Sequence, residues 1–397
     1  MARIDSLRKH CAKQCLDLVI HQALVQTERS PDVQDAFSRL LAAVCSRTGL
    51  LHPMPPGGRL SWTQPASVVR GLLALAQWHM VWLRDVGTWE PTGSCVLRQF
   101  GSLARHLLCT HPVPRFMDRV WFSGRSKEAG RRQKWFRHVG LVGGIRGTDI
   151  PVRLTKTMAQ HFMRAPDHYT VEAALRWGQI LDFGGDAALV DAVVATRLGR
   201  SFSHERYWER ILRFFVHNAG LLLPHVGAIV EYLDFHKLIF RLEPPLPEKR
   251  KTILELLDRV AEWQSPRLAD SQIPKLKWHK AGIGNFECQE YLGRSRGVRI
   301  WTIRELLDSN ALAAEGKVMR HCVGNYGNWC FKRVSSIWSM MCHSRSGKEH
   351  VLTIEIDPTT RTIVQAKGKQ NSPPSPEARR IMLKWAATKH LAVADGV

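Results

Sequence analysis

A ten-residue segment near the C-terminus, residues 321–330, concentrates side chains that could do chemistry. It reads His-Cys-Val-Gly-Asn-Tyr-Gly-Asn-Trp-Cys and combines a histidine, two cysteines and a tyrosine with glycines and asparagines. A helix or strand that serves only packing has little use for this mixture of polar and reactive groups. We therefore predict a functional site centred on the HCVGNY sequence at residues 321–326.

Acid–base or phosphodiester chemistry is one reaction type that these residues would support. The candidate catalytic residues for it are His321, Tyr326, Glu355 and Gln365. Glu355 alternates with Ile354 and Ile356 in a predicted strand, so its carboxylate should point away from the apolar face. Lys367 or Lys369 would offset negative charge on a substrate. Because a histidine with a carboxylate suffices for metal-free RNA cleavage, a nuclease or related transferase is one interpretation.

Thiol chemistry is a second reaction type, with Cys322 as the candidate catalytic nucleophile. A thiolate needs a neighbouring cation or base, and His321 is adjacent in sequence. Adjacent side chains diverge by about 100° on a helix and about 180° on a strand, so His321 is badly placed to serve Cys322. The base would come from elsewhere, with His343 or His350 as candidates.

A metal site is the third alternative. The residues that could offer ligands are His321, Cys322, Cys330, Cys342 and His343. Their spacing, H-C-x7-C-x11-C-H, differs from the C-x2-C pairs of common zinc sites. Zinc therefore stays an alternative for the cofactor, and we assign no metal ligands.

A purely structural interpretation competes with all three chemistries. If residues 319–330 formed one helix, Cys322, Tyr326 and Cys330 would share a face as small core residues. Gly324 and Gly327 argue against an uninterrupted helix there. Under this interpretation the segment belongs to a noncatalytic binding module.

The charge of the chain favours polyanionic partners. Its 397 residues include 57 Lys and Arg against 35 Asp and Glu, a net charge of +22, and residues 271–397 hold 20 against 10. This balance predicts DNA or RNA as the partner, before an anionic membrane surface. No apolar stretch approaches the roughly 20 residues of a membrane span. Nine irregularly spaced cysteines and an N-terminus without an apolar signal core predict reduced thiols in a cytoplasmic protein. The oligomeric state does not follow from the sequence.

Residues 115–137 interleave basic and aromatic side chains. The predicted nucleic-acid contacts in this stretch are Arg125, Lys127, Arg131, Arg132, Lys134, Trp135 and Arg137. Guanidinium groups neutralise phosphates, and aromatic faces stack on bases. The alternative is a solvated basic helix whose aromatic rings, Trp135 among them, lie in the core.

Hydrophobic periodicity predicts an α+β fold, with an all-helical N-terminal region followed by a C-terminal α+β domain with a small, mainly antiparallel sheet. We expect domains at 1–150, 151–264 and 265–397. Predicted helices cover about 31–46, 64–84, 154–163, 170–182, 186–197, 203–217, 225–240 and 249–264. Strands are predicted at 286–292, 298–301, 335–341, 350–356 and 362–367, the last two as a hairpin. Residues 302–305, Thr-Ile-Arg-Glu, have the form of a capping box, which predicts that a helix begins there and runs to about Glu315.

Three sequence blocks of the C-terminal part resemble the PcfJ-like family of plasmid and mobile-element proteins. They are Glu315-Gly316-(x2)-Met319-Arg320-His321-Cys322-Val323-Gly324-(x)-Tyr326-(x3)-Cys330, Thr353-Ile354-Glu355-Ile356, and Gln365-(x2)-Gly368-(x2)-Asn371. The resemblance covers about residues 270–392, and residues 151–262 more loosely. It implies a role in conjugative or other mobile elements, with other mobile-element proteins as further partners, but no mechanism. Lys367, Lys369 and Asn371 are predicted to contact nucleic acid beside the site. A scaffold whose helical region recruits protein partners is the remaining alternative.

Overall fold

The computed structural model describes residues 16–28, 30–52, 65–122, 127–240, 246–247, 249–264, 276–291, 298–344 and 347–394. The chain divides into two compact units, Met1–Leu223 and Pro224–Val397. The three-part division expected from the sequence stays a prediction. Among the described residues no single helix is long and apolar enough to cross a membrane, whereas one bent pair, Glu205–His217 with Ala219–Lys237, meets the length and composition criteria together.

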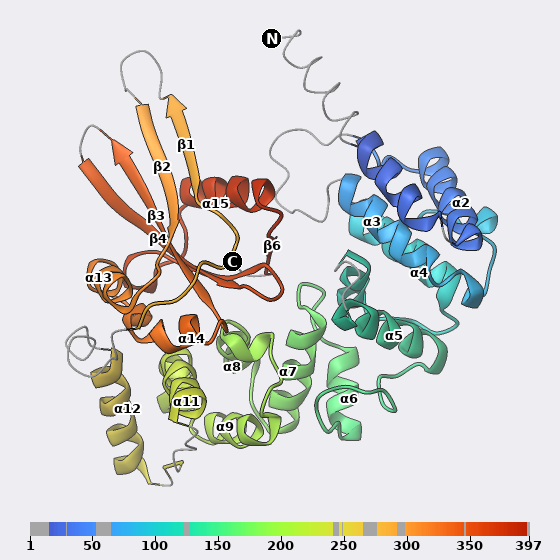
Figure 1. Ribbon diagram of the computed structural model, residues 1–397. Coiled ribbons are helices and arrows are strands. Elements are labelled where there is room, and N and C mark those ends of the chain that lie inside the picture. Colours follow the sequence, from blue (N-terminus) through green and yellow to red (C-terminus); the bar gives the residue numbers. More distant parts are fainter. Residues whose placement is uncertain are drawn as a thin grey trace. The chain divides into compact units, whose positions relative to one another are not determined.

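The first unit is helical throughout its described part (Figure 1). Its α-helices are α2 (Pro31–Arg47), α3 (Pro65–Ala76), α4 (Val96–Leu108), α5 (Lys127–Val142), α6 (Lys156–Met163), α7 (Val171–Asp182), α8 (Ala187–Val194), α9 (Glu205–His217) and α10 (Ala219–Leu222). Short 3-10 helices join them, namely η2 (His79–Val81), η3 (Val86–Thr88), η4 (Arg115–Phe122) and η5 (Arg197–Gly199).

Side-chain caps fix several of these helices where the sequence predicted them. The hydroxyls of Thr155 and Thr170 and the carboxylate of Asp186 accept hydrogen bonds from the backbone amides at the starts of α6, α7 and α8. Each cap satisfies an amide that the helix itself leaves without a partner. The predicted helix at 64–84 is wrong in its length, because α3 ends at Ala76 and a 3-10 turn follows.

Aromatic side chains from η4 and its neighbours form the core of this unit. Phe116 and Trp121 of η4 and Trp135 and Phe136 of α5 are each at most 1% exposed. The rings of Trp121 and Phe136 meet edge to face at 5.3 Å. The aromatic residues of the basic segment therefore pack inward, as the core interpretation of that segment requires.

A buried carboxylate in η4 makes the stability of this unit depend on pH. Burial raises the pKa of Asp118 to about 7, although Arg105 donates to it at 2.6 Å. An unfolded aspartate titrates near about 3.9. Since the folded state holds the proton more tightly, the free energy of unfolding should fall as pH rises from about 4 to about 7. Asp118→Asn should flatten this dependence in urea unfolding measured across that range.

The matched control for this measurement is the exposed Asp17. Asp17→Asn removes the same ionisable group from the surface of the same unit and should leave the slope unchanged. A wild-type slope in Asp118→Asn would contradict the assignment.

The second unit joins two helices to a six-stranded sheet. The helices at its start are α11 (Val226–Phe240) and α12 (Arg250–Gln264). The strands are β1 (Phe286–Tyr291), β2 (Val298–Glu305), β3 (Ser336–Ser344), β4 (Gly347–Asp357), β5 (Thr362–Lys367) and β6 (Ala392–Val393), in that order across the sheet. All neighbours are antiparallel except β5 and β6, which confirms the predicted fold class.

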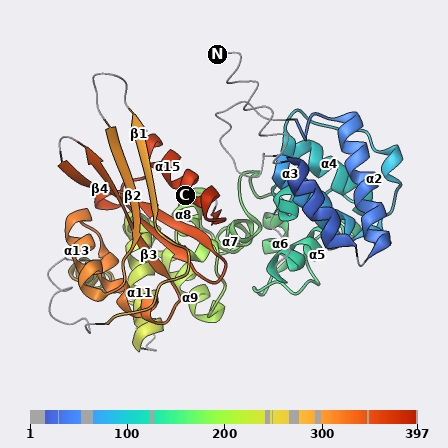
Figure 2. The ribbon, with the colours of Figure 1, turned by 45° about the horizontal axis from the view of Figure 1, so that its top comes forward.

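Helices cover both faces of this sheet. Figures 1 and 2 show α15 (Pro376–Thr388) on one face and α13 (Ser309–Met319) on the other. Ile354 and Ile356 of β4 pack with Ile381 and Trp385 of α15 in the larger hydrophobic cluster. Ser375 caps α15 by accepting from the amide of Ala378 at 3.2 Å. Alternate residues of β4 are thereby left for the α13 face.

The predicted helix start at Thr302 is wrong. Residues 298–305 form one strand, and the carboxylate of Glu305 accepts from the amide of Ala281 instead of capping a helix. The helix begins at Ser309, where Asp308 accepts from the amide of Ala311 at 2.8 Å. Trp301 and Ile303 supply the reason, because only a strand puts both of them into the core beneath α15.

Candidate functional site

Four side chains form a hydrogen-bonded chain on the α13 face of the sheet. His321 Nε2 lies 2.9 Å from Thr353 Oγ1, which donates to Glu315 Oε1 at 2.7 Å. The other oxygen of Glu315 lies 2.8 Å from His350 Nδ1. Glu315 is 2% exposed, so one buried carboxylate connects both histidines. We call these four residues the Glu315 network.

The network determines which imidazole nitrogens carry protons. The hydroxyl of Thr353 gives its hydrogen to Glu315, so it must accept from His321, which then carries hydrogen on Nε2. Burial lowers the pKa of His321, against the opposing effect of Glu315. His321 is therefore a neutral imidazole with its lone pair on Nδ1 at pH 7. His350 donates from Nδ1, which leaves Nε2 as its acceptor.

Helix α13 places Glu315 beneath the site. Leu312 and Met319 lie three residues before and four residues after Glu315, and both are buried. Glu315 therefore occupies the inward face of the helix. The helix ends at Met319. Arg320 follows it in a left-handed conformation with φ of 56°, and the backbone of His321 is then extended.

Gly316 permits the chain to double back over α13. A Cβ atom on Gly316 would lie 3.0 Å from the carbonyl oxygen of His321 and 3.2 Å from the amide of Gly324. Both atoms belong to the backbone and cannot rotate away, so a larger residue would require the segment to shift by a few tenths of an ångström. The glycine next to Glu315 thus allows the His321 backbone to lie close to the helix.

Two irregularities in the sheet decide which strand residues join the site. Strict alternation along β4 would put His350 on the same face as Leu352 and Ile354. The register shifts between Met340 and Met341, so that Met340 pairs with Leu352 but Met341 pairs with His350. This bulge turns His350 toward Thr353 and Glu315.

A second register shift brings two of the predicted catalytic residues together. It lies between Glu355 and Ile356, and it places Glu355 directly opposite Gln365 on β5. Glu355 points away from the apolar face, as the alternation predicted, and accepts from Ser335 Oγ at 3.0 Å. Glu355 and Gln365 thus share the face of the Glu315 network. Glu355 is two residues after Thr353 along β4, and Gln365 lies opposite Glu355 on β5.

The remaining part of the HCVGNY segment contributes to packing. It forms η8 (Cys322–Tyr326) and α14 (Gly327–Phe331), which confirms that the glycines interrupt the helix. Tyr326 is 6% exposed and contacts Trp329 edge to face in a cluster with Cys330. Burial, followed by Glu355, raises the pKa of the Cys330 thiol. The side chain of Cys322 lies outside the part of the chain that the structure describes.

Two of the cysteines considered as possible metal ligands lie in different parts of the second unit. Cys330 of α14 packs in the cluster with Tyr326 and Trp329, whereas Cys342 belongs to the separate cluster with α15. His343 contacts Thr302 Oγ1 at 3.2 Å. Among the described residues no group of three or more His, Cys, Asp or Glu side chains is placed to bind a metal.

Cationic residues surround the Glu315 network. Lys317 and Arg320 are exposed at the end of α13. Lys367 lies directly opposite Thr353 in the ladder between β4 and β5. The 3-10 turn η9 (Lys369–Asn371) follows β5 beside α13, and its residues are exposed. Lys367, Lys369 and Asn371, predicted to contact nucleic acid, therefore lie around the predicted catalytic residues.

The basic residues predicted on α5 belong to the first unit. Arg131 pairs with Glu128, and Arg132 pairs with Glu172. Lys127 and Lys134 are exposed, and Arg137 is partly exposed. Trp135 is 1% exposed and donates from Nε1 to Asp149, so its ring is not open to a base in this structure. Arg125 lies outside the described residues.

Comparison with known protein families identifies the part of the chain that carries this site. Residues 296–382 match the PcfJ-like protein family. The match contains the whole Glu315 network and the Glu355–Gln365 pair. No curated protein and no solved structure matches the chain. We refer to the matched residues as the PcfJ-like segment, and its detection confirms the resemblance drawn from the sequence motifs.

Sequence reasoning missed Glu315 and Thr353 as site residues, although both stand in the PcfJ-like motifs. The missed signal is a lone carboxylate at i+3 from Leu312 and i−4 from Met319, that is, on the apolar face of a helix. A buried carboxylate needs a charged or hydrogen-bonding partner, so this position predicts a polar network.

Proposed function

We propose that this chain is a nucleic-acid-associated protein of a mobile genetic element, with the Glu315 network as its functional site. The observation that carries the proposal is a buried carboxylate that orients two histidines on a face surrounded by cations. Burying a carboxylate is costly unless hydrogen bonds and charge compensate, and packing alone would be served by an apolar residue. The mobile-element role rests on the PcfJ-like match.

The surrounding cations select the class of ligand. Lys317, Arg320, Lys367 and Lys369 flank the network, while its own carboxylate lies buried between the histidines. Such a surface attracts phosphates and repels cationic groups. Phosphate contacts of this kind make affinity fall steeply with salt.

Phosphodiester cleavage is the second candidate function, and the orientation of the two imidazoles favours it. On RNA, Nδ1 of neutral His321 would take the proton of a 2′-hydroxyl as that oxygen attacks phosphorus. The bond from phosphorus to the 5′ oxygen breaks, and the leaving oxygen takes a proton from Nε2 of a protonated His350. The products are a 2′,3′-cyclic phosphate and a 5′-hydroxyl, with no metal required.

Loss of His321 separates the two functions. Labelled single-stranded DNA, duplex DNA and RNA would be incubated with the purified chain, with and without chelator, and run on native and denaturing gels. For a nuclease we expect cleavage that survives the chelator and falls by roughly 100-fold or more in His321→Ala, the usual contribution of one acid–base group. For a binding module we expect a salt-sensitive shift without cleavage.

Two variants make this experiment specific. Thr353→Val removes the hydroxyl that links His321 to Glu315 while keeping the side-chain shape, and should reproduce much of the loss in cleavage. His279→Ala removes an exposed histidine of the same unit outside the site and should have no effect. Absence of any shift or cleavage at low salt would overturn the nucleic-acid proposal.

A further inference from the structure

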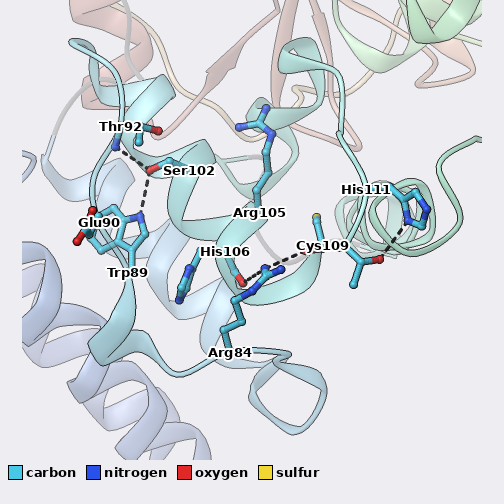
Figure 3. Close-up of a pocket in the computed structure, with 10 residues that line it drawn as sticks. Arg84, Trp89, Glu90, Thr92, Ser102, Arg105, His106, Cys109 and His111 are labelled. Atoms are coloured by element: carbon cyan, nitrogen blue, oxygen red, sulfur yellow. Dashed lines mark hydrogen bonds between the residues drawn. The ribbon is translucent and has the colours of Figure 1, made fainter.

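Two pockets of the first unit differ in what their cations do. In the pocket of Figure 3, about 360 Å³ in volume, Arg84 donates to the carbonyl oxygens of His106 and Cys109 at 2.9 and 3.0 Å. Arg105 donates to Asp118. These two arginines therefore already donate hydrogen bonds to the C-terminal end of α4 and to the buried aspartate.

The second pocket, about 340 Å³ in volume, lies along one face of α5. Lys134, Arg137, His138 and Leu141 line it at i, i+3, i+4 and i+7, the spacing of one helical face. Lys134 is exposed. Arg137 Nε is buried and, within the described part of the chain, has no hydrogen-bond partner. The guanidinium therefore keeps a donor at this pocket that a ligand could use.

Aromatic and apolar groups also line this pocket. Trp78 is partly exposed there, and its indole Nε1 donates to Gln133 at 3.1 Å, which fixes the ring. The ring centroids of Trp78 and Trp121 lie 6.5 Å apart with their planes nearly perpendicular, so contact with the core restricts the Trp78 ring. Val142, also in the lining, is 61% exposed. Asp149, the one acidic residue in the lining, accepts from Trp135 Nε1.

We propose that this pocket binds one unpaired nucleotide of a single-stranded nucleic acid, with its base against Trp78 and its phosphate on Lys134 and Arg137. The inference deepens the proposed association with nucleic acid and rests on it. Cations and a fixed indole in one pocket match the phosphate and the base of a nucleotide, and single strands are bound by this combination. Duplex DNA keeps its bases stacked and would not fill the pocket. Trp78 thereby takes the stacking role that the sequence suggested for Trp135.

Binding of a labelled single-stranded oligonucleotide to the full chain tests the proposal. We expect Lys134→Ala/Arg137→Ala to weaken binding by roughly tenfold and to reduce the salt slope by about 0.7 for each lost phosphate contact. Trp78→Leu should weaken binding by roughly fivefold or more, while Trp78→Phe, which keeps a ring, should retain most of the affinity. Lys156→Ala, an exposed charge loss at the start of α6, should leave affinity within twofold.

Competition and specificity supply the outcomes that would overturn it. Adenosine monophosphate should displace the oligonucleotide from the wild-type chain at a lower concentration than inorganic phosphate does. Neither compound should displace the oligonucleotide that still binds to Lys134→Ala/Arg137→Ala. Equal competition by inorganic phosphate, equal affinity for duplex DNA, or wild-type affinity of Lys134→Ala/Arg137→Ala would each refute the pocket assignment. His321→Ala tests the Glu315 network, whereas Lys134→Ala/Arg137→Ala tests the pocket. A failure of one proposal can therefore be told apart from a failure of the other.

Discussion

Replacing Glu315 by alanine is expected to lower the free energy of unfolding of the second unit by about 3 kcal/mol or more. The side chain is 2% exposed and accepts from Thr353 and His350. Its removal leaves a hydroxyl and an imidazole without their charged acceptor in a poorly hydrated place, and hydrogen bonds to a charge contribute about 1.5–3 kcal/mol each. The same change frees His321, so any activity of the site should disappear as well.

Denaturant unfolding of the full chain, followed by tryptophan fluorescence, measures the change. Glu315→Gln keeps an oxygen acceptor for one partner and should lose about half as much stability. The matched control is Glu377→Ala, because Glu377 forms a solvent-exposed pair with Arg299 and such pairs contribute about 1 kcal/mol or less. If Glu315→Ala unfolded at the same denaturant concentration as Glu377→Ala, the network could not be what orders the site.

Arg176→Ala is expected to destabilise the first unit by about 3–5 kcal/mol. The guanidinium is completely buried and donates to both carboxylate oxygens of Glu205, at 2.6 and 3.0 Å. It also donates to Gln179 and to the carbonyl oxygens of Leu198 and Ser201. Truncation would leave Glu205 and these two carbonyl groups without the hydrogen bonds of the guanidinium, at the place where α7 meets α9.

Removing both charges of this pair should cost less than removing one. Arg176→Met leaves an unpaired carboxylate, whereas Arg176→Met/Glu205→Leu leaves none, so the double variant should be more stable than the single variant. Arg115→Ala is the control, since Arg115 forms an exposed pair with Asp167 in the same unit and should matter by about 0.5 kcal/mol. Equal unfolding midpoints for Arg176→Met and the double variant would contradict this account.

Local signals determined the helices and the hairpin. Thr155, Thr170 and Asp186 precede amphipathic runs, and a capping side chain needs only residues three positions away to act. The β4–β5 hairpin followed in the same way from alternation and a turn at Asp357, whose carboxylate accepts from Thr359. The helix misplaced at Thr302 shows the limit of such signals, because a core position for Ile303 outweighs a capping box.

From the sequence by itself we predicted a site around His321, and alternation along the strand also determined that Glu355 faces away from the apolar cluster. Which side chains complete that site was decided by the tertiary structure. One bulge in β4 and one in β5 turn His350 and Gln365 onto the face of Glu355, and a bulge depends on pairing between strands that the sequence does not specify. Glu315 contacts His350 across 35 residues of chain, and only the packing of α13 on the sheet brings the two together.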